Sequence, residues 1–211
     1  MSNITFISTI HKEIGKCNPD ELCKIIEQIK PEVIFLEARE EDYSKEQRIL
    51  FSSFPVFHKR LEISAIQRYE LSNIIEYEPV LDNGLADAFD KKYKIVFKNP
   101  VLQKLGDSFN KIAGEGGFDF LNSLESTRLQ EEMRTEELRI LNNVKLANEV
   151  DADIEEYENA MLRNIYSYCK KYSFTTAIFM CGVAHRKSII EKINKLKARE
   201  EVKLNWIVYE Y

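Results

Sequence analysis

The stretch AIFMCGVAHRKSIIEKI, residues 177–193, decides the fold class. Its apolar run up to Gly182 predicts a buried strand, and the amphipathic pattern that follows predicts a helix beginning directly after His185. The N-terminus has the same plan, because the apolar run ITFIS at 4–8 leads to His11. The chain therefore opens and closes with a strand, a turn containing Gly or Ser, a histidine, a helix and a strand.

The segment after the first histidine predicts a parallel strand–helix–strand unit. Asn18 is a candidate helix cap with Pro19 at the first helical position, and Pro31 ends the helix. The run EVIFLEA at 32–38 then predicts a second buried strand. Since such units form right-handed parallel crossovers, we expect an α/β fold. Its mixed central sheet would be built from two related strand-turn-helix halves and flanked by helices.

The remaining pattern predicts a third strand at 73–80 and a final strand at 202–210. Residues 84–172 are mostly helical by pattern, with a flexible turn at 113–118, where three of the seven glycines lie. We expect one domain, 1–211, with a helical insertion at roughly 84–172. The insertion would be either an amphipathic hairpin on a solvated surface or a lid or dimerisation arm that makes a homo-oligomer.

The composition argues against several classes of partner. The chain is 44% hydrophobic, and its net charge of -5 argues against a general nucleic-acid partner. No apolar run approaches the roughly 20 residues that span a bilayer, and the N-terminus does not read as a signal peptide. We therefore expect a cytoplasmic protein with no membrane partner. Its four cysteines form no Cys-x-x-Cys pair and are expected to be small buried hydrophobes.

Two of the three histidines stand where a predicted strand ends, and so does one acid. His11 follows Ser-Thr-Ile, His185 follows Gly-Val-Ala, and Glu37 closes the run VIFLE. Ligands gather outside the carboxyl ends of strands in open α/β sheets, so neighbouring strands would bring these three side chains to one rim.

Two imidazoles and a carboxylate are a usual ligand set for a divalent metal, here zinc, manganese, cobalt or iron. The same three side chains could work without a metal, with a histidine as general base and an acid that holds its tautomer. A third alternative is structural. Each histidine then only satisfies hydrogen bonds at its strand end, and Glu37 pairs with Arg39.

Arg163 is the fourth candidate, because it lies within the apolar helical stretch ENAMLRNIYSYC. Such a guanidinium either pairs with an acid at the edge of the core or serves as a clamp for an anion or oxyanion. The third histidine, His58, is expected on the surface.

These residues together resemble the TraB/TIKI superfamily, which also takes in the erythromycin esterases and the ChaN-like haem-binding proteins. The resemblance covers roughly residues 4–38 and 158–195. Ser8 stands where the group usually has Gly. The matching motifs, in chain order, are Ser8-Thr9-Ile10-His11, the run PEVIFLE ending at Glu37, the step Arg163-Asn164, and Gly182 to His185.

The resemblance implies a fold of two related halves with both histidines and the glutamate in one cleft. It also implies a hydrolase that cleaves a peptide or ester bond of a small-molecule or peptide substrate. The catalytic residues would be His11, Glu37, Arg163 and His185, and a divalent metal, if used, would bind His11, Glu37 and His185. The ChaN-like relatives keep open a ligand- or metal-binding module without turnover. A helical interaction protein with a vestigial cleft is a third alternative.

Overall fold

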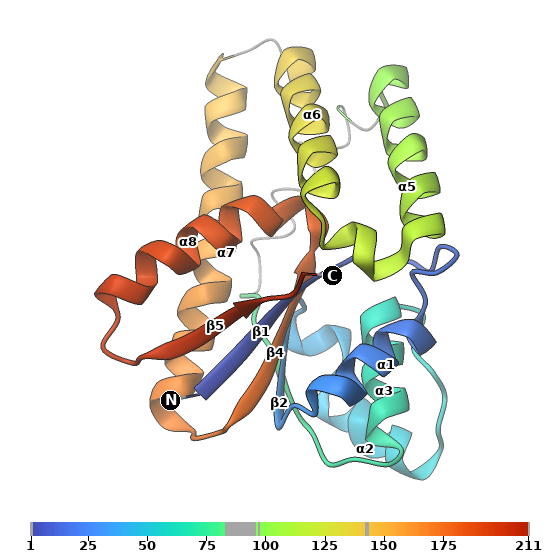
Figure 1. The fold of residues 1–211 in the computed structure, drawn as a ribbon, viewed down its shortest axis with the longest axis vertical. Helices are drawn as coiled ribbons and strands as arrows, with labels where there is room; N and C mark the ends of the chain where they lie inside the picture. Colours follow the sequence, from blue (N-terminus) through green and yellow to red (C-terminus); the bar gives the residue numbers. More distant parts are fainter. Residues whose placement is uncertain (1, 83–95, 97, 142–143, 211) are drawn as a thin grey trace.

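The computed structural model describes residues 2–82, 96, 98–141 and 144–210. Its strands form one five-stranded sheet in the order β3-β2-β4-β1-β5 (Figure 1). The strands are β1 (Ser2–Thr9), β2 (Val33–Leu36), β3 (Glu76–Pro79), β4 (Thr176–Gly182) and β5 (Leu204–Val208). The α/β class is confirmed. A mixed sheet was expected, but every pairing within this sheet is parallel.

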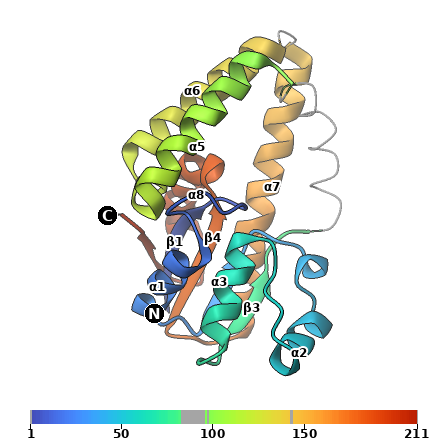
Figure 2. The same cartoon turned by 90° about the vertical axis from the view of Figure 1, so that its right-hand side faces the viewer.

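Helices cover both faces of the sheet, as parallel strands require. α1 and α3 pack on one face and α7 and α8 on the other, while α5, α6 and one half of α7 extend beyond the carboxyl ends of the strands (Figures 1 and 2). The helices are α1 (Pro19–Ile29), α2 (Lys45–Ser53), α3 (Leu61–Glu70), α5 (Pro100–Leu121), α6 (Leu124–Leu141), α7 (Val144–Lys171) and α8 (Arg186–Arg199). Two 3-10 turns are η1 (Glu40–Asp42) and η2 (Val183–His185).

The long helical region is confirmed by α5, α6 and α7, although residues 84–95, 97, 142 and 143 of the expected insertion lie outside the described residues. α6 packs against η2, so this region reaches the turn that carries His185. Within the described ranges, no helix combines the length and the apolar character that crossing a membrane needs.

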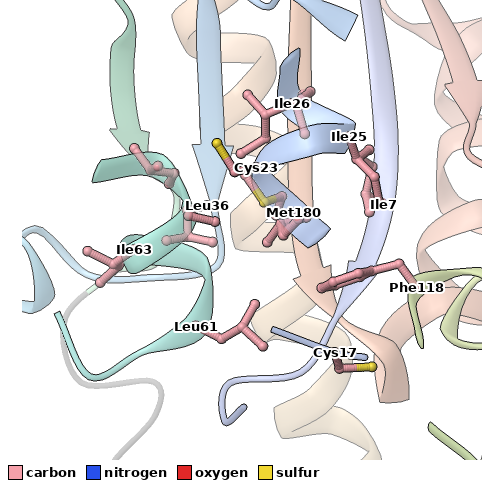
Figure 3. Close-up of a cluster of buried hydrophobic side chains, with 14 of the residues drawn as sticks. Ile7, Cys17, Cys23, Ile25, Ile26, Leu36, Leu61, Ile63, Phe118 and Met180 are labelled. Atoms are coloured by element: carbon pink, nitrogen blue, oxygen red, sulfur yellow. The ribbon is translucent and has the colours of Figure 1, made fainter. Parts of the chain in front are cut away.

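Alternation along the strands gives the sheet two cores. Ile7, Leu36 and Met180 point to the face that α1 and α3 cover (Figure 3). Their neighbours in the chain, among them Phe6 and Phe179, point to the face covered by α7 and α8. All five side chains are fully buried, so the three inner strands are fixed in register on both faces.

The ends of α1 follow the sequence signals. The Asn18 side chain accepts a hydrogen bond from the Glu21 backbone N–H at 3.0 Å, and Pro19 begins the helix. Lys30 ends it with a left-handed φ of 52° immediately before Pro31. The predicted strand–helix–strand unit is therefore confirmed.

The helical pattern is interrupted within 113–118 as expected, but by a bend and not by a flexible turn. The helix continues through Gly114 and Gly116 as part of α5 and bends only at Gly117, which has a φ of 66° and a ψ of -152°. The Lys16 backbone N–H donates to the Gly114 carbonyl at 2.8 Å. Gly114 and Gly117 therefore serve the close approach of this helix to the loop that holds Ile14 and Lys16.

Candidate active site

The three predicted strand-end residues meet because β4 lies between β1 and β2. Thr9 is in register with Gly182, and Leu36 with Met180, so the strands end at one edge of the sheet. His11, Glu37 and His185 follow these strand ends by one to three residues and therefore lie at that edge. His11, Glu37 and His185 are therefore neighbours, and we call them the histidine–glutamate cluster.

The side chains of this cluster face a common point. His185 Nε2 lies 3.7 Å from Glu37 Oε1. A Cβ placed on Gly182 would lie 3.1 Å from Glu37 Oε2 and 3.7 Å from His11 Nε2. Both histidines thus turn their Nε2 atoms toward the same carboxylate.

Glu37 is buried, with 4% of its surface exposed, and both of its oxygens accept hydrogen bonds. Tyr157 donates its hydroxyl proton to Oε1 at 2.7 Å, and the Gly182 backbone N–H donates to Oε2. Burial alone raises the pKa of Glu37. The charges of His185 and His11 together with these hydrogen bonds outweigh it and lower the pKa to about 2. Glu37 is therefore an ionised carboxylate at neutral pH.

His11 is oriented by a second, buried carboxylate. Its Nδ1 lies 2.9 Å from Oε1 of Glu62, which also accepts a hydrogen bond from Thr9 Oγ1 at 2.9 Å. Because an ionised carboxylate only accepts, Nδ1 carries the proton and Nε2 is left free. Burial lowers the pKa of His11, but the hydrogen bond and charge of Glu62, with the charge of Glu37, raise it above 6.5 overall. Half of the His11 side chain is exposed, so water reaches it.

His185 repeats this arrangement on the other side of Glu37. Its Nδ1 lies 2.8 Å from Glu158 Oε1, and Glu158 is also bonded by Ser188 Oγ and lies 3.2 Å from Lys192 Nζ. Burial lowers the pKa of His185, but Glu158 and Glu37 outweigh it, so the pKa is raised above 6.5. Only 14% of this side chain is exposed. The two histidines therefore differ mainly in their access to water.

Sequence reasoning missed Glu62, Glu158, Tyr157 and Arg60. The acids did leave a signal: Glu158 shares a buried helix face with Met161 and Ile165, and Glu62 shares one with Ile66 and Tyr69. A carboxylate on such a face needs a partner, and here each partner is a strand-end histidine.

Arg60 is the guanidinium that the structure places beside the cluster. Its Nε lies 3.2 Å from Glu62 Oε2, and its Nη2 donates to the Glu37 carbonyl. The same Nη2 is 3.1 Å from His11 Nδ1. Because the Nδ1 proton is donated to Glu62, Nη2 and Nδ1 are both donors and do not hydrogen-bond to each other. His58 was expected on the surface but is half-buried, and its Nδ1 accepts a hydrogen bond from the Arg60 backbone N–H at 3.0 Å.

Arg163 is not brought to the cluster. It lies six residues after Tyr157 on α7, about 9 Å along the helix axis, and its side chain is 54% exposed. Nη2 lies 3.2 Å from Asp82 Oδ2, and Nη1 lies 3.4 Å from Glu156 Oε1. These contacts match the ion-pair alternative, with an acid that follows β3.

A buried arginine ties together the turns that carry the two histidines. Arg186 donates to Ser8 Oγ at 3.2 Å, to Asn122 Oδ1 at 2.8 Å, to the Asn122 carbonyl at 2.8 Å and to the Tyr209 carbonyl at 2.9 Å. The Asn122 side chain also bonds both the backbone N–H and the carbonyl of Ser8. Ser8 lies within β1, and Lys30 alone among the described non-glycine residues has a positive φ. Ser therefore suits this position.

The side chains do not fit a resident divalent metal in this arrangement. Among the described residues, no group of three His, Cys, Asp or Glu side chains is arranged to hold one. Both Glu37 oxygens already accept hydrogen bonds, and the Arg60 cation lies beside His11. The chemistry below therefore uses the side chains of the protein.

Elemental analysis tests the metal predicted from the sequence. We expect purified wild-type protein, incubated with zinc, manganese or cobalt and then dialysed, to hold less than one equivalent. His11→Ala and His185→Ala should hold no less than the wild type. Stoichiometric metal in the wild type that is lost in both variants would contradict this geometry and make the two histidines metal ligands.

No protein-family model matches this chain, and no curated protein sequence is similar to it. Among solved structures, a mutant of an erythromycin esterase in its open conformation is a weak structural neighbour, with a TM-score of 0.30 and 14% sequence identity. The match covers 99% of this chain and 60% of that one, so this chain spans about three fifths of the length of that esterase. Neither its activity nor its site is transferred to this chain.

Gly182 offers a substitution that acts on the cluster alone. The methyl group of Gly182→Ala would touch Glu37 and His11, so we expect kcat to fall about 10²-fold through misplacement of these side chains. The φ of -55° suits alanine, so thermal stability should change little. Gly106→Ala is the control, since a Cβ there meets no atom within 4 Å. Wild-type activity in Gly182→Ala would place the reacting atoms elsewhere.

Proposed function

We propose that this protein is a hydrolase related to the TraB/TIKI superfamily, and that it cleaves an ester bond with His11 and His185. One observation carries the proposal. Each strand-end histidine has its Nδ1 on a buried carboxylate and its Nε2 turned toward the shared Glu37. The segments that supply the cluster are also three of the four motifs that resemble the superfamily. That agreement supports the relationship.

His11 is the better placed general base, because half of its side chain is exposed while its tautomer is fixed. Water gives a proton to Nε2 as its oxygen bonds to the acyl carbon. Glu62 keeps the other proton on Nδ1 and stabilises the imidazolium that forms, in the manner of a carboxylate–histidine dyad.

His185 is the better placed general acid, because it is enclosed and its pKa is raised. Its Nε2 proton passes to the leaving oxygen as the carbon–oxygen bond breaks. The acid and the alcohol leave, and exchange of protons with solvent returns His11 to the neutral form and His185 to the charged form. Glu37 stabilises the charge on whichever ring is protonated.

An ester is favoured over a peptide because its leaving group needs less activation. The test is a panel with a p-nitrophenyl ester, an ethyl ester of the same acid and a short peptide. We expect ester hydrolysis above the rate in buffer, with the peptide cleaved much more slowly. No hydrolysis of either ester would overturn the proposal, and faster cleavage of the peptide would assign the protein to the peptidases.

The pH profile identifies the base. With the p-nitrophenyl ester, whose leaving group needs no proton from His185, we expect kcat/KM to rise with pH through a pKa above 6.5, because His11 must be neutral to accept a proton. Glu62→Gln removes the charge that raises this pKa, so the rising limb should move to lower pH and the maximum should fall. Glu70→Gln is the control on the same helix, since Glu70 bonds Tyr43 and not a histidine. An unmoved limb in Glu62→Gln would contradict the role of His11.

A further inference from the structure

The hydroxyl of Tyr157 donates a hydrogen bond to Glu37. Building on the proposed function, we propose that Tyr157 is a positioning residue that occupies Glu37 Oε1 and so keeps the Nε2 proton of His185 available for the leaving group. The sequence motifs do not include this residue, and its role acts through two other side chains.

Each oxygen of the Glu37 carboxylate accepts a hydrogen bond. Tyr157 donates to Oε1 at 2.7 Å, and the Gly182 backbone N–H donates to Oε2. His185 Nε2 lies 3.7 Å from the same Oε1, which is beyond hydrogen-bond distance. The carboxylate is therefore satisfied by a phenol and a backbone amide, and the imidazole beside it is not bonded to it.

Two consecutive residues of α7 fix the imidazole ring of His185. The Tyr157 ring stacks on His185, with centroids 5.3 Å apart and planes 23° from parallel. The next residue, Glu158, accepts the Nδ1 proton at 2.8 Å. One face and one edge of the imidazole are thus fixed by consecutive residues, and Nε2 is aimed toward Glu37 without reaching it.

Removal of the Tyr157 hydroxyl leaves Glu37 Oε1 without this donor. A buried carboxylate oxygen without a donor is costly, so it takes the nearest one. His185 Nε2 lies 3.7 Å from this oxygen and is the charged donor beside it, so it needs to move only about 1 Å to reach charge-assisted hydrogen-bond distance. In that hydrogen bond His185 would donate its Nε2 proton to Glu37 instead of to the leaving group of the substrate.

The consequence depends on the leaving group, which separates this role from a general loss of structure. An ethyl ester leaves as an alkoxide and needs the proton, whereas p-nitrophenolate leaves without one. Tyr157→Phe keeps the stacked ring and removes only the hydroxyl. Tyr166→Phe is the matched control, because Tyr166 is buried on the same helix and its hydroxyl accepts from Trp206 Nε1 at 3.2 Å.

We expect Tyr157→Phe to lower kcat for the ethyl ester by at least about 10²-fold while changing kcat for the p-nitrophenyl ester by less than about threefold. Tyr166→Phe should leave the ratio of the two rates unchanged. An equal fall for both esters, or no fall for either, would overturn the inference.

A second measurement does not depend on activity. In protein labelled with ¹⁵N-histidine, the chain has only three ring systems to assign, and His185→Ala identifies the signals of His185. We expect a slowly exchanging Nε2 proton of His185 in Tyr157→Phe and a rapidly exchanging one in the wild type and in Tyr166→Phe. Equal exchange in all three proteins would overturn the positioning role even if neither ester is a substrate.

Discussion

His11→Ala is expected to lose about 10²- to 10⁴-fold in kcat/KM toward the ester that the wild type hydrolyses best, because it removes the proposed general base. The fold should survive. Half of the His11 side chain is exposed, and its main partner, Glu62, keeps hydrogen bonds from Thr9 and Arg60. Steady-state kinetics with circular dichroism on the same samples would measure both.

The neighbouring Lys12 provides the control for this prediction. Lys12→Ala changes an exposed residue of the same turn and should retain wild-type kinetics. His185→Ala should lose a similar factor with an ethyl ester and much less with a p-nitrophenyl ester, since only the first needs an acid. Unchanged activity in both His11→Ala and His185→Ala would rule out the cluster as the reaction centre.

The largest expected effect on stability comes from Arg186→Met. Arg186 is 3% exposed and donates to four oxygen atoms on three segments of the chain. Methionine keeps the apolar stem but leaves the buried Asn122 carbonyl without this donor. We expect the free energy of unfolding to fall by about 3 kcal/mol, measured by urea denaturation.

Lys187→Met is the matched control, since it changes the next residue on the same helix. Lys187 is about half exposed and pairs with Glu131 on the surface, so its loss should change the free energy of unfolding by less than about 0.5 kcal/mol. Equal effects of the two substitutions would mean that the buried network does not hold these turns together.

The sequence predicts those parts of the fold that depend on neighbouring residues in the chain. The strands are short apolar runs that end one to three residues before His11, Glu37 and His185, and α1 carries its own cap. Since β4 pairs with both β1 and β2, residues predicted separately became neighbours. Predicting that His11, Glu37 and His185 lie together therefore required only the strand order in addition to the local sequence patterns.

The parts that were missed depend on packing between elements. Nothing local to α3 or α7 states that Glu62 and Glu158 face a histidine, because the partner lies on another segment. The same is true of the two arginines. Arg163 has apolar neighbours in sequence but reaches Asp82 and Glu156, whereas Arg60, in a polar stretch, turns inward to Glu37.

The central place of β4 has a consequence for how the protein is made. Thr9 and Cys181, which bond across the β1–β4 pair, are 172 residues apart in the chain. A ribosome therefore releases β1 and β2, with apolar side chains that are buried in the folded protein, long before the strand that joins them exists. The nascent chain must carry these segments unpaired, where they are open to chaperones and to aggregation. A translation product that stops before β4 lacks the strand that joins β1 to β2 and cannot assemble the histidine–glutamate cluster.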